Sequence, residues 1–332
     1  MGRYIFNRIL QVIPLLIVIS IISFIIIDLP PGDFLSTYVE QLAQQGTTVS
    51  AQEIARLQAQ YGLDQPLPTR YWTWITNIIL HGDFGYSFQW NRPVVDLIGE
   101  RIGLTLALSF VTIFVTYAVA IPAGIYSAIY HRSALDYLIT FIGFIGLAIP
   151  NFLLALVLVW LTFAYFDFPI TGLFSAAYAD EPWSFAKFID LLQHIWIPIL
   201  IIGTSGTAAI IRVMRGGMLD EINQQYVVTA RAKGVAEQRL IYKYPARVAI
   251  NPIISTIGWL LPATISQESV VSIILNIPSA GPLLLNALLS QDMYLAGSFI
   301  LILSVLTVLG TLVSDILLAW LDPRIRYQGG SR

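Results

Sequence analysis

The sequence of 332 residues has no cysteine and unusually few charged residues. Without cysteine the chain has no disulfide, no thiolate metal site and no cysteine nucleophile. Only 11% of its residues are charged, whereas a soluble domain carries roughly 25%. Because 56% of the residues are hydrophobic and the mean hydropathy is +0.73, the sequence predicts an integral membrane protein rather than a soluble one.

Motifs for chemistry are also missing. The sequence contains no G-x-x-x-x-G-K-[ST] phosphate loop, so it does not hydrolyse ATP by that motif. Its three histidines, His81, His131 and His194, fall in three different predicted loops, and no spacing of His, Asp and Glu indicates a metal site. We therefore expect neither an enzyme nor a cofactor in this chain.

Six apolar stretches are long enough to cross a bilayer, which takes about 20 residues. They are 9–28, 104–129, 135–163, 195–214, 252–274 and 293–320. Most Lys and Arg residues lie in the segments before the first stretch, between the fourth and fifth, and after the sixth. Since cytoplasmic loops are enriched in Lys and Arg, both ends of the chain are expected in the cytoplasm. The parts are then residues 1–28, with the first span, a large extracytoplasmic region 29–100, a bundle 101–320 containing a cytoplasmic loop 215–250, and a cytoplasmic tail 321–332.

The extracytoplasmic region carries two helix signals. Ser50 and Glu53 form a capping box that opens a short helix. Residues 70–80 are rich in aromatics but too short to span, so they are expected to lie in the membrane interface, with a platform for an external partner as the alternative. In the third span, Gly143 and Gly146 allow close helix approach, and Pro150 makes either a packing kink or part of a cavity.

The long basic loop is the most polar part of the chain, and with the two arginines that precede its polar stretch it accounts for these seven basic residues: Arg212, Arg215, Arg231, Lys233, Arg239, Lys243 and Arg247. Its pattern predicts a helix over 223–233, a stop at Gly234, a second helix over 236–244 and an end at Pro245. The apolar patch of Leu240, Ile241 and Tyr244 indicates a helix that lodges in a groove on another protein. The alternative is a loop lying on anionic lipid headgroups.

Acidic residues are rare inside the predicted spans, where Glu268 and Asp315 are the clear exceptions. An ionised carboxylate in hydrocarbon costs at least ~2.5–3.5 kcal/mol, so Glu268 is expected to face a water-filled pathway or a partner group. The alternative is a structural hydrogen bond to another helix. For Asp315, near the inner end of the sixth span, a bridge to an arginine is expected.

Several motifs then occur in one order along nearly the whole chain: RYIFNRIL and PGD near the start, YGLDQPLPTRYWTW and GDFGYSF in the outer region, GLAIPNF in the third span, YVVTARAKGV in the basic loop and DPRIRY in the tail. In these motifs the sequence resembles the permease subunits of ABC importers of the dipeptide, oligopeptide and nickel class, which are inner-membrane components of binding-protein-dependent transport systems. The resemblance implies an all-α, six-helix type I importer permease in a bacterial or archaeal cytoplasmic membrane.

The resemblance also implies partners. A second, similar permease completes the pathway, two ATPase subunits bind ATP and Mg, and an extracytoplasmic binding protein delivers substrate. Membrane lipid is the remaining contact, and no nucleic acid is expected. The basic loop is similar to the family's ATPase-docking loop, which implies docking residues in this chain: Tyr226, Thr229, Ala230, Arg231, Ala232, Lys233, Gly234, Arg239 and Lys243.

The sequence departs from the family pattern in several places, and two of these departures concern candidate site residues. Val228, Thr229 and Ala230 stand where the general pattern has Glu-Ala-Ala, as in the peptide branch of the family. Ser272 stands where a glutamate usually precedes the turn after the fifth span, and Glu268 lies one helical turn earlier on the same face. Glu268 and Ser272 are therefore the expected pathway residues.

The expected function is a permease subunit that imports di- or oligopeptides. The same machine with another cargo, such as nickel chelates or oligosaccharides, stays open. A secondary transporter coupled to an ion gradient and a membrane scaffold are the alternatives of a different class, and the scarcity of charged residues in the spans disfavours the first of them.

Overall fold

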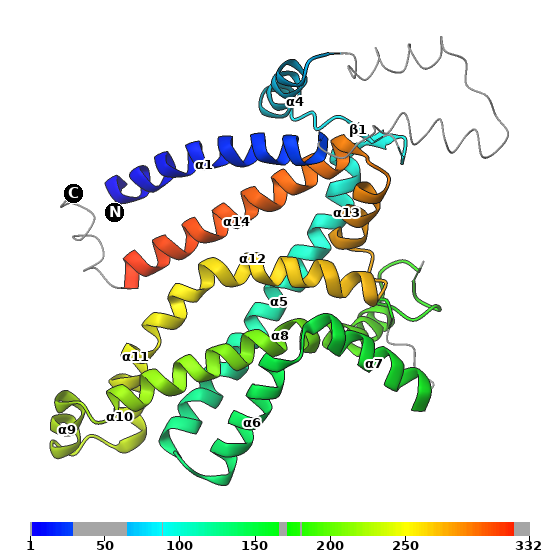
Figure 1. Ribbon diagram of the computed structural model, residues 1–332. Helices are drawn as coiled ribbons and strands as arrows, with labels where there is room; N and C mark the ends of the chain where they lie inside the picture. The colour runs from blue at the N-terminus through cyan, green and yellow to red at the C-terminus, as the bar shows by residue number, and fades with distance from the viewer. Residues whose placement is uncertain (1, 29–64, 88, 166–170, 180, 322–332) are drawn as a thin grey trace. The chain divides into compact units, whose positions relative to one another are not determined.

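The computed structural model describes residues 2–28, 65–87, 89–165, 171–179 and 181–321, and the expected capping box at Ser50 lies outside them. The described chain is helical apart from two short strands (Figure 1). Within these residues, four helices are long and apolar enough to cross a membrane, and the number rises to six if each of two bent helix pairs is one span. Six spans agree with the sequence prediction.

The long helices expose much of their apolar surface. Phe114 and Phe163 are 72% and 79% exposed, and many Leu, Ile and Val side chains on the same helices are also exposed. Water-facing surfaces rarely carry such extended apolar area, whereas lipid accommodates it. The exposure is therefore that of a membrane-embedded bundle.

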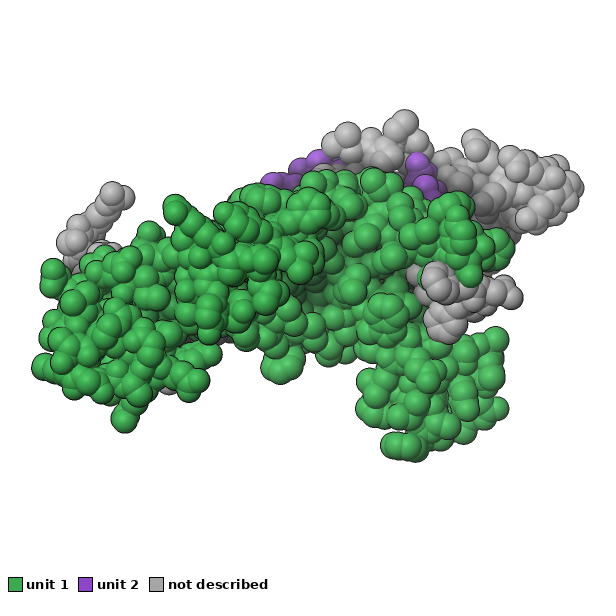
Figure 2. Space-filling model, turned by 90° about the horizontal axis from the view of Figure 1, so that it is seen from below, with its two compact units in different colours: residues 1–6, 105–278, 309–332 green, residues 7–104, 279–308 purple. Residues whose placement is uncertain are grey.

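The chain divides into two compact units, coloured separately in Figure 2. Unit 1 comprises residues 1–6, 105–278 and 309–332, and unit 2 comprises residues 7–104 and 279–308. Helices α1 (Gly2–Asp28), α5 (Val94–Ile129) and α14 (Met293–Leu321) contribute residues to both.

Unit 2 holds α4 (Leu67–His81), α13 (Ala280–Leu289) and an antiparallel pair of strands, β1 (Tyr86–Ser87) and β2 (Arg92–Pro93). Its core joins the first turns of α5 to α13 and α14 through residues such as Leu97, Ala287 and Phe299. The expected second span, 104–129, was thus too short, because the helix continues beyond the apolar stretch that crosses the bilayer. The segment between the expected fifth and sixth spans contains α13.

The aromatic helix α4 was expected in the membrane interface. Its Trp74 is buried and its ring centroid lies 5.6 Å from that of Phe24 of α1, while the Tyr71 hydroxyl bonds with Ser20 Oγ at 2.8 Å. Trp72 remains 67% exposed on another face. Part of the aromatic surface therefore packs against the first span, and the rest is available to lipid or to a partner.

Unit 1 is built around α8 (Phe185–Glu221), which runs well beyond the expected span 195–214. Helices α6 (Ala134–Ala148), α7 (Asn151–Tyr165), α11 (Pro245–Ala249) and α12 (Asn251–Ile274) all pack against it. A Cβ on Gly146 would come 2.6 Å from Thr204 Cγ2, so this glycine does permit the expected close approach of α6 and α8. A Cβ on Gly143 would lie 3.8 Å from Ala208 Cβ, which is an ordinary van der Waals distance.

The expected third span, 135–163, is not one straight helix. Helices α6 and α7 meet at an angle of 100° around Ile149 and Pro150, because proline removes a helical hydrogen bond and biases the preceding residue towards extended geometry. Helix α12 is also bent, by 50°, between its segments Asn251–Ile257 and Leu260–Ile274. The prediction of a kink at Pro150 is confirmed, with a much larger bend than a packing kink requires.

Candidate functional site

The basic loop folds as three short helices at one end of α8 (Figure 1): α9 (Gln225–Ala232), α10 (Glu237–Lys243) and α11. Gly234 has a φ of +78°, and its N–H donates to the carbonyl of Arg231 at 3.0 Å. Only glycine adopts this left-handed backbone freely, so the expected helix stop at Gly234 is confirmed.

Pro245 has a second effect that the sequence pattern did not reveal. Helix α10 ends at Lys243, as expected from the proline, but Pro245 then opens α11. Proline suits the first position of a helix, where the missing N–H has no intrahelical partner anyway. The loop therefore continues as a third helix, which packs directly against α8.

The inner face of the loop is packed against its own chain. Val227 and Leu240 are fully buried, Ala230 and Ile241 nearly so, and all four join a core with residues of α5, α8 and α12. The expectation that the apolar patch of α10 lodges in another protein's groove is therefore wrong. That surface is already used to hold the loop on unit 1.

The outer face carries most of the predicted docking residues. The exposed ones are Tyr226, Thr229, Arg231, Ala232, Lys233, Gly234, Arg239 and Lys243. Of the set named from the sequence, only Ala230 points inward. Tyr242, 65% exposed, belongs to the same outward surface and was missed because it sits beside the apolar residues of α10.

Two polar contacts order this outer face. Arg231 Nη2 lies 2.7 Å from Glu237 Oε1, which ties α9 to α10 across the turn. The hydrogen bond to Arg231 lowers the pKa of Glu237. Tyr226 donates its hydroxyl to Glu221 at the end of α8, and burial together with this bond raises the pKa of Tyr226 to about 12. The ring is therefore neutral at physiological pH.

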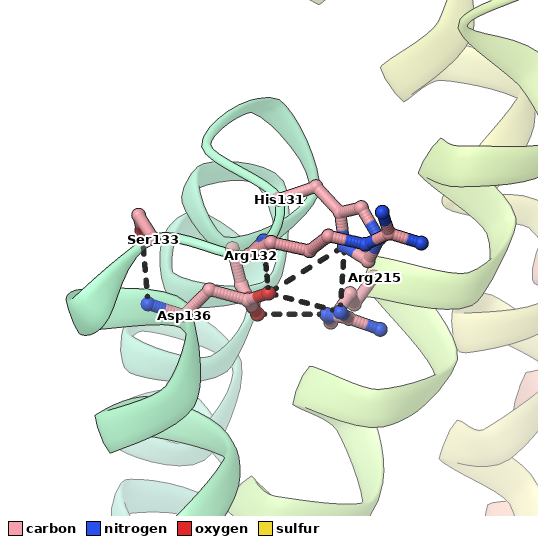
Figure 3. A network of polar contacts seen from close by, with 6 residues as sticks. His131, Arg132, Ser133, Asp136 and Arg215 are labelled. Atoms are coloured by element: carbon pink, nitrogen blue, oxygen red, sulfur yellow. Dashed lines mark hydrogen bonds and ion pairs between the residues drawn. The ribbon is translucent and has the colours of Figure 1, made fainter.

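A second polar network joins α6 to α8 near the loop (Figure 3). The carboxylate of Asp136, 2% exposed, accepts from Arg215 Nε at 2.8 Å and from Nη2 at 3.0 Å. It also accepts from the Arg132 N–H at 2.9 Å and from the Ser127 hydroxyl. Arg215 Nη2 donates to His131 Nδ1 at 2.9 Å. Arg215 therefore links α8 to α6 through an ion pair, although the sequence analysis grouped it with the basic loop.

The two expected pathway residues lie one turn apart on α12, as their spacing predicts. Glu268 is fully buried and Ser272 is 1% exposed, with its hydroxyl donating to the carbonyl of Ser269 at 3.0 Å. Neither side chain reaches the surface of the chain. Their pathway role stays a prediction.

A cavity lies near these residues, between the junction of α6 with α7, the middle of α8 and α12, and Pro150 lines it, in agreement with the cavity alternative stated for this proline. Its volume is about 370 Å³, and Asn151, Ser205, Ser266 and Gln267 line it. Asn151 Nδ2 donates to Gln267 Oε1 at 2.5 Å and to the Ile202 carbonyl at 3.3 Å. The signal in the sequence was Asn151 after Pro150, inside an otherwise apolar span.

These features define a multi-span helical membrane protein with a folded loop between two of its spans. The chain belongs to the family of inner membrane components of binding-protein-dependent transport systems, whose model matches residues 120–327. The N-terminal model of the same family matches residues 1–109. The recognition made from the sequence motifs is confirmed.

Curated relatives match the chain along nearly its whole length. The oligopeptide transport system permease protein AppB of Bacillus subtilis is 34% identical, over 98% of this chain and 100% of its own. The glutathione transport system permease protein GsiC of Escherichia coli is 30% identical, over 99% and 100%. The oligopeptide transport system permease protein OppB of Haemophilus influenzae is 28% identical, over 98% and 100%.

Among solved structures, the chain matches the MetNI methionine ABC transporter in inward-facing conformations. The TM-score is 0.54 at 14% identity, covering 68% of this chain and 96% of that one. At this identity the likeness establishes the fold. It confirms the predicted type I importer permease architecture.

Proposed function

We propose that this chain is a permease subunit of an ATP-driven importer of di- or oligopeptides, and that it forms the translocation pathway with a second, similar permease. One observation supports the proposal most: the apolar face of a folded loop is buried against the bundle, and a polar, basic face is exposed. Such a surface suits docking of another protein. The peptide cargo is supported by relatives named for peptides that match nearly the full length of the chain.

The docking partner in this proposal is an ATPase subunit, one for each permease. ATP and Mg belong to the two ATPase subunits, and this chain itself carries no cofactor. The loop and both chain ends lie in the cytoplasm, which the concentration of Lys and Arg in these segments supports. An extracytoplasmic binding protein brings the peptide to the opposite face of a bacterial or archaeal cytoplasmic membrane.

The structure suggests how motion at the loop reaches the spans. Helices α9 and α10 share one buried core with α8, α12 and the end of α5, and α11 packs directly on α8. The Arg215–Asp136 ion pair connects α8 to α6. Close-packed interiors transmit displacement rather than absorb it. A shift of the loop driven by ATPase closure is therefore expected to move α8, α6 and α12 together.

The test is reconstitution of the complete complex in proteoliposomes, with trialanine as the probe. The account predicts uptake that needs ATP, the binding protein and all four membrane-associated subunits. Uptake of nickel chelates or maltotriose in place of trialanine would show that the complex is an ATP-driven importer of a different substrate. Uptake driven by a proton gradient without ATP would contradict the proposal.

A further inference from the structure

The cavity between α7, α8 and α12 has the chemistry of a binding site rather than of a packing gap. Its volume of about 370 Å³ lies within the ~300–1,000 Å³ that small-ligand pockets occupy. It is open rather than enclosed, and Ile149 and Pro150, at the 100° bend between α6 and α7, form part of its lining. Bends of this kind place polar groups at membrane depth, and transporters use discontinuous helices to build substrate sites there.

The lining combines apolar residues with uncharged polar ones. Among the described residues that form the cavity, none carries a charge, and its polar side chains are two amides and two hydroxyls: Asn151, Gln267, Ser205 and Ser266. Glu268 follows Gln267 in the sequence but is fully buried and does not line the cavity. A charged terminus or side chain of a ligand would lose hydration here without gaining a counter-ion. The cavity therefore suits a neutral polar group.

The two amides offer a matched donor and acceptor. Asn151 and Gln267 are joined by one direct hydrogen bond of 2.5 Å, and Ser205 Oγ lies 3.5 Å from the same Gln267 oxygen. Two side-chain amides joined by one bond retain one carbonyl oxygen and one NH2 group for other partners, and no contact within the described chain occupies the Asn151 oxygen or the Gln267 NH2. A peptide group presents the complementary N–H and C=O.

We infer that this amide pair binds the backbone peptide group of the substrate as it crosses the membrane. The inference rests on the proposed function and adds how the cargo is recognised. Recognition of the backbone is independent of the side chains, so the site accepts peptides of differing sequence. Val270 and Phe152 give the remainder of the cavity an apolar lining for side chains of the substrate.

The experiment compares trialanine with the analogue methylated at both of its peptide nitrogens, which lacks the N–H donors. The complete transporter is reconstituted with its binding protein, whose Kd for each peptide is measured first so that it is saturated in both assays. The maximal rate of ATP-dependent uptake should be roughly three- to tenfold lower for the methylated peptide, the effect of one hydrogen bond. Gln267→Leu and Asn151→Leu should slow trialanine and bring the ratio of the two rates close to one.

Thr162→Val is the matched control. This residue also lies on α7, but its hydroxyl bonds only within its own helix, to the Leu158 and Val159 carbonyls. The Thr162→Val transporter should keep the wild-type ratio of the uptake rates for trialanine and its methylated analogue. ATP hydrolysis stimulated by the loaded binding protein should persist in all variants, which separates substrate contact from assembly.

Two outcomes distinguish failure of the amide-pair inference from failure of the proposed importer function. If the wild-type transporter takes up both peptides at the same maximal rate, or if assembled leucine variants keep the wild-type ratio, the inference is overturned while the importer stands. If the wild type takes up no peptide with ATP, the proposed function fails and the inference with it. The wild-type comparison decides even when a variant fails to assemble.

Discussion

Arg215 and Asp136 are joined by two hydrogen bonds, at 2.8 and 3.0 Å, that connect the C-terminal part of α8 to the first turn of α6. Asp136 is almost completely buried, so its charge depends on this partner and on the Ser127 and Arg132 donors. The residues are far apart in the sequence, and no local pattern pairs them. Their contact is the one charged link between these two helices that we find in the described residues.

Asp136→Ala should therefore destabilise the protein strongly. Removing one partner of a buried ion pair costs roughly 3 kcal/mol or more, because the other charge is left without compensation. The measurement is thermal or denaturant unfolding of the detergent-solubilised complex. Arg215→Met should cost at least as much alone, because it leaves the more deeply buried Asp136 carboxylate without its counter-ion, and the double variant should show a coupling of roughly 0.5–3 kcal/mol. Arg212→Gln, an exposed neighbour on α8, is the control and should be near neutral.

Gly234 is expected to matter through its backbone alone. A Cβ there meets no atom within 4 Å, but the φ of +78° is costly for other residues. Gly234→Ala should destabilise the turn by roughly 1–2 kcal/mol, and Gly234→Asn by less. Weaker ATPase co-purification, with lower uptake per ATP hydrolysed, is the expected result. Gly216→Ala, at an equally open position of α8 without positive φ, should assemble and transport normally; equal effects at both glycines would argue against this account.

Glutamate substitutions at Ala230 and Ala232 should have different effects, because Ala230 faces the core and Ala232 faces outward. Ala232→Glu places an acidic side chain on the exposed surface and should block ATPase binding while leaving the unfolding temperature unchanged. Ala230→Glu buries a charge and should reduce folding itself. The check is co-purification of the ATPase alongside thermal unfolding. Normal co-purification of the ATPase with folded Ala232→Glu would show that this face is not a docking surface.

The Arg231–Glu237 pair predicts a defined pH dependence. Arg231 lowers the pKa of Glu237 in the folded loop, so the pair contributes stability above the unfolded glutamate pKa of about 4.3. That contribution is lost as pH falls through the lowered, folded pKa. The difference in unfolding temperature between wild type and Glu237→Gln should be constant between about pH 6 and 9 and vanish in acid. Both groups are exposed, so the difference should be small and should shrink with added salt.

The sequence predicts much of this fold from local signals. Apolar run length locates the spans, and Gly234 and Pro150 mark a turn and a break through their backbone restrictions. Helix length beyond the bilayer was not predictable, because packing of Val94 and Leu97 against α13 and α14 extends α5. The buried face of α10 was misassigned because an amphipathic pattern shows that a face is covered and does not say by which chain. The Asn151–Gln267 and Arg215–Asp136 contacts depend on tertiary proximity.

The central claim, that the outer face of α9 and α10 docks an ATPase, is tested most directly by site-specific cross-linking. Because the natural chain has no cysteine, Ala232→Cys or Arg239→Cys creates a single reactive thiol in this subunit. In the assembled complex, a short thiol-directed photo-cross-linker should join both positions to the ATPase. The same probe on Trp183→Cys, which is 70% exposed before α8, should give no ATPase adduct. Adducts at Trp183 and none at Ala232 or Arg239 would contradict the account.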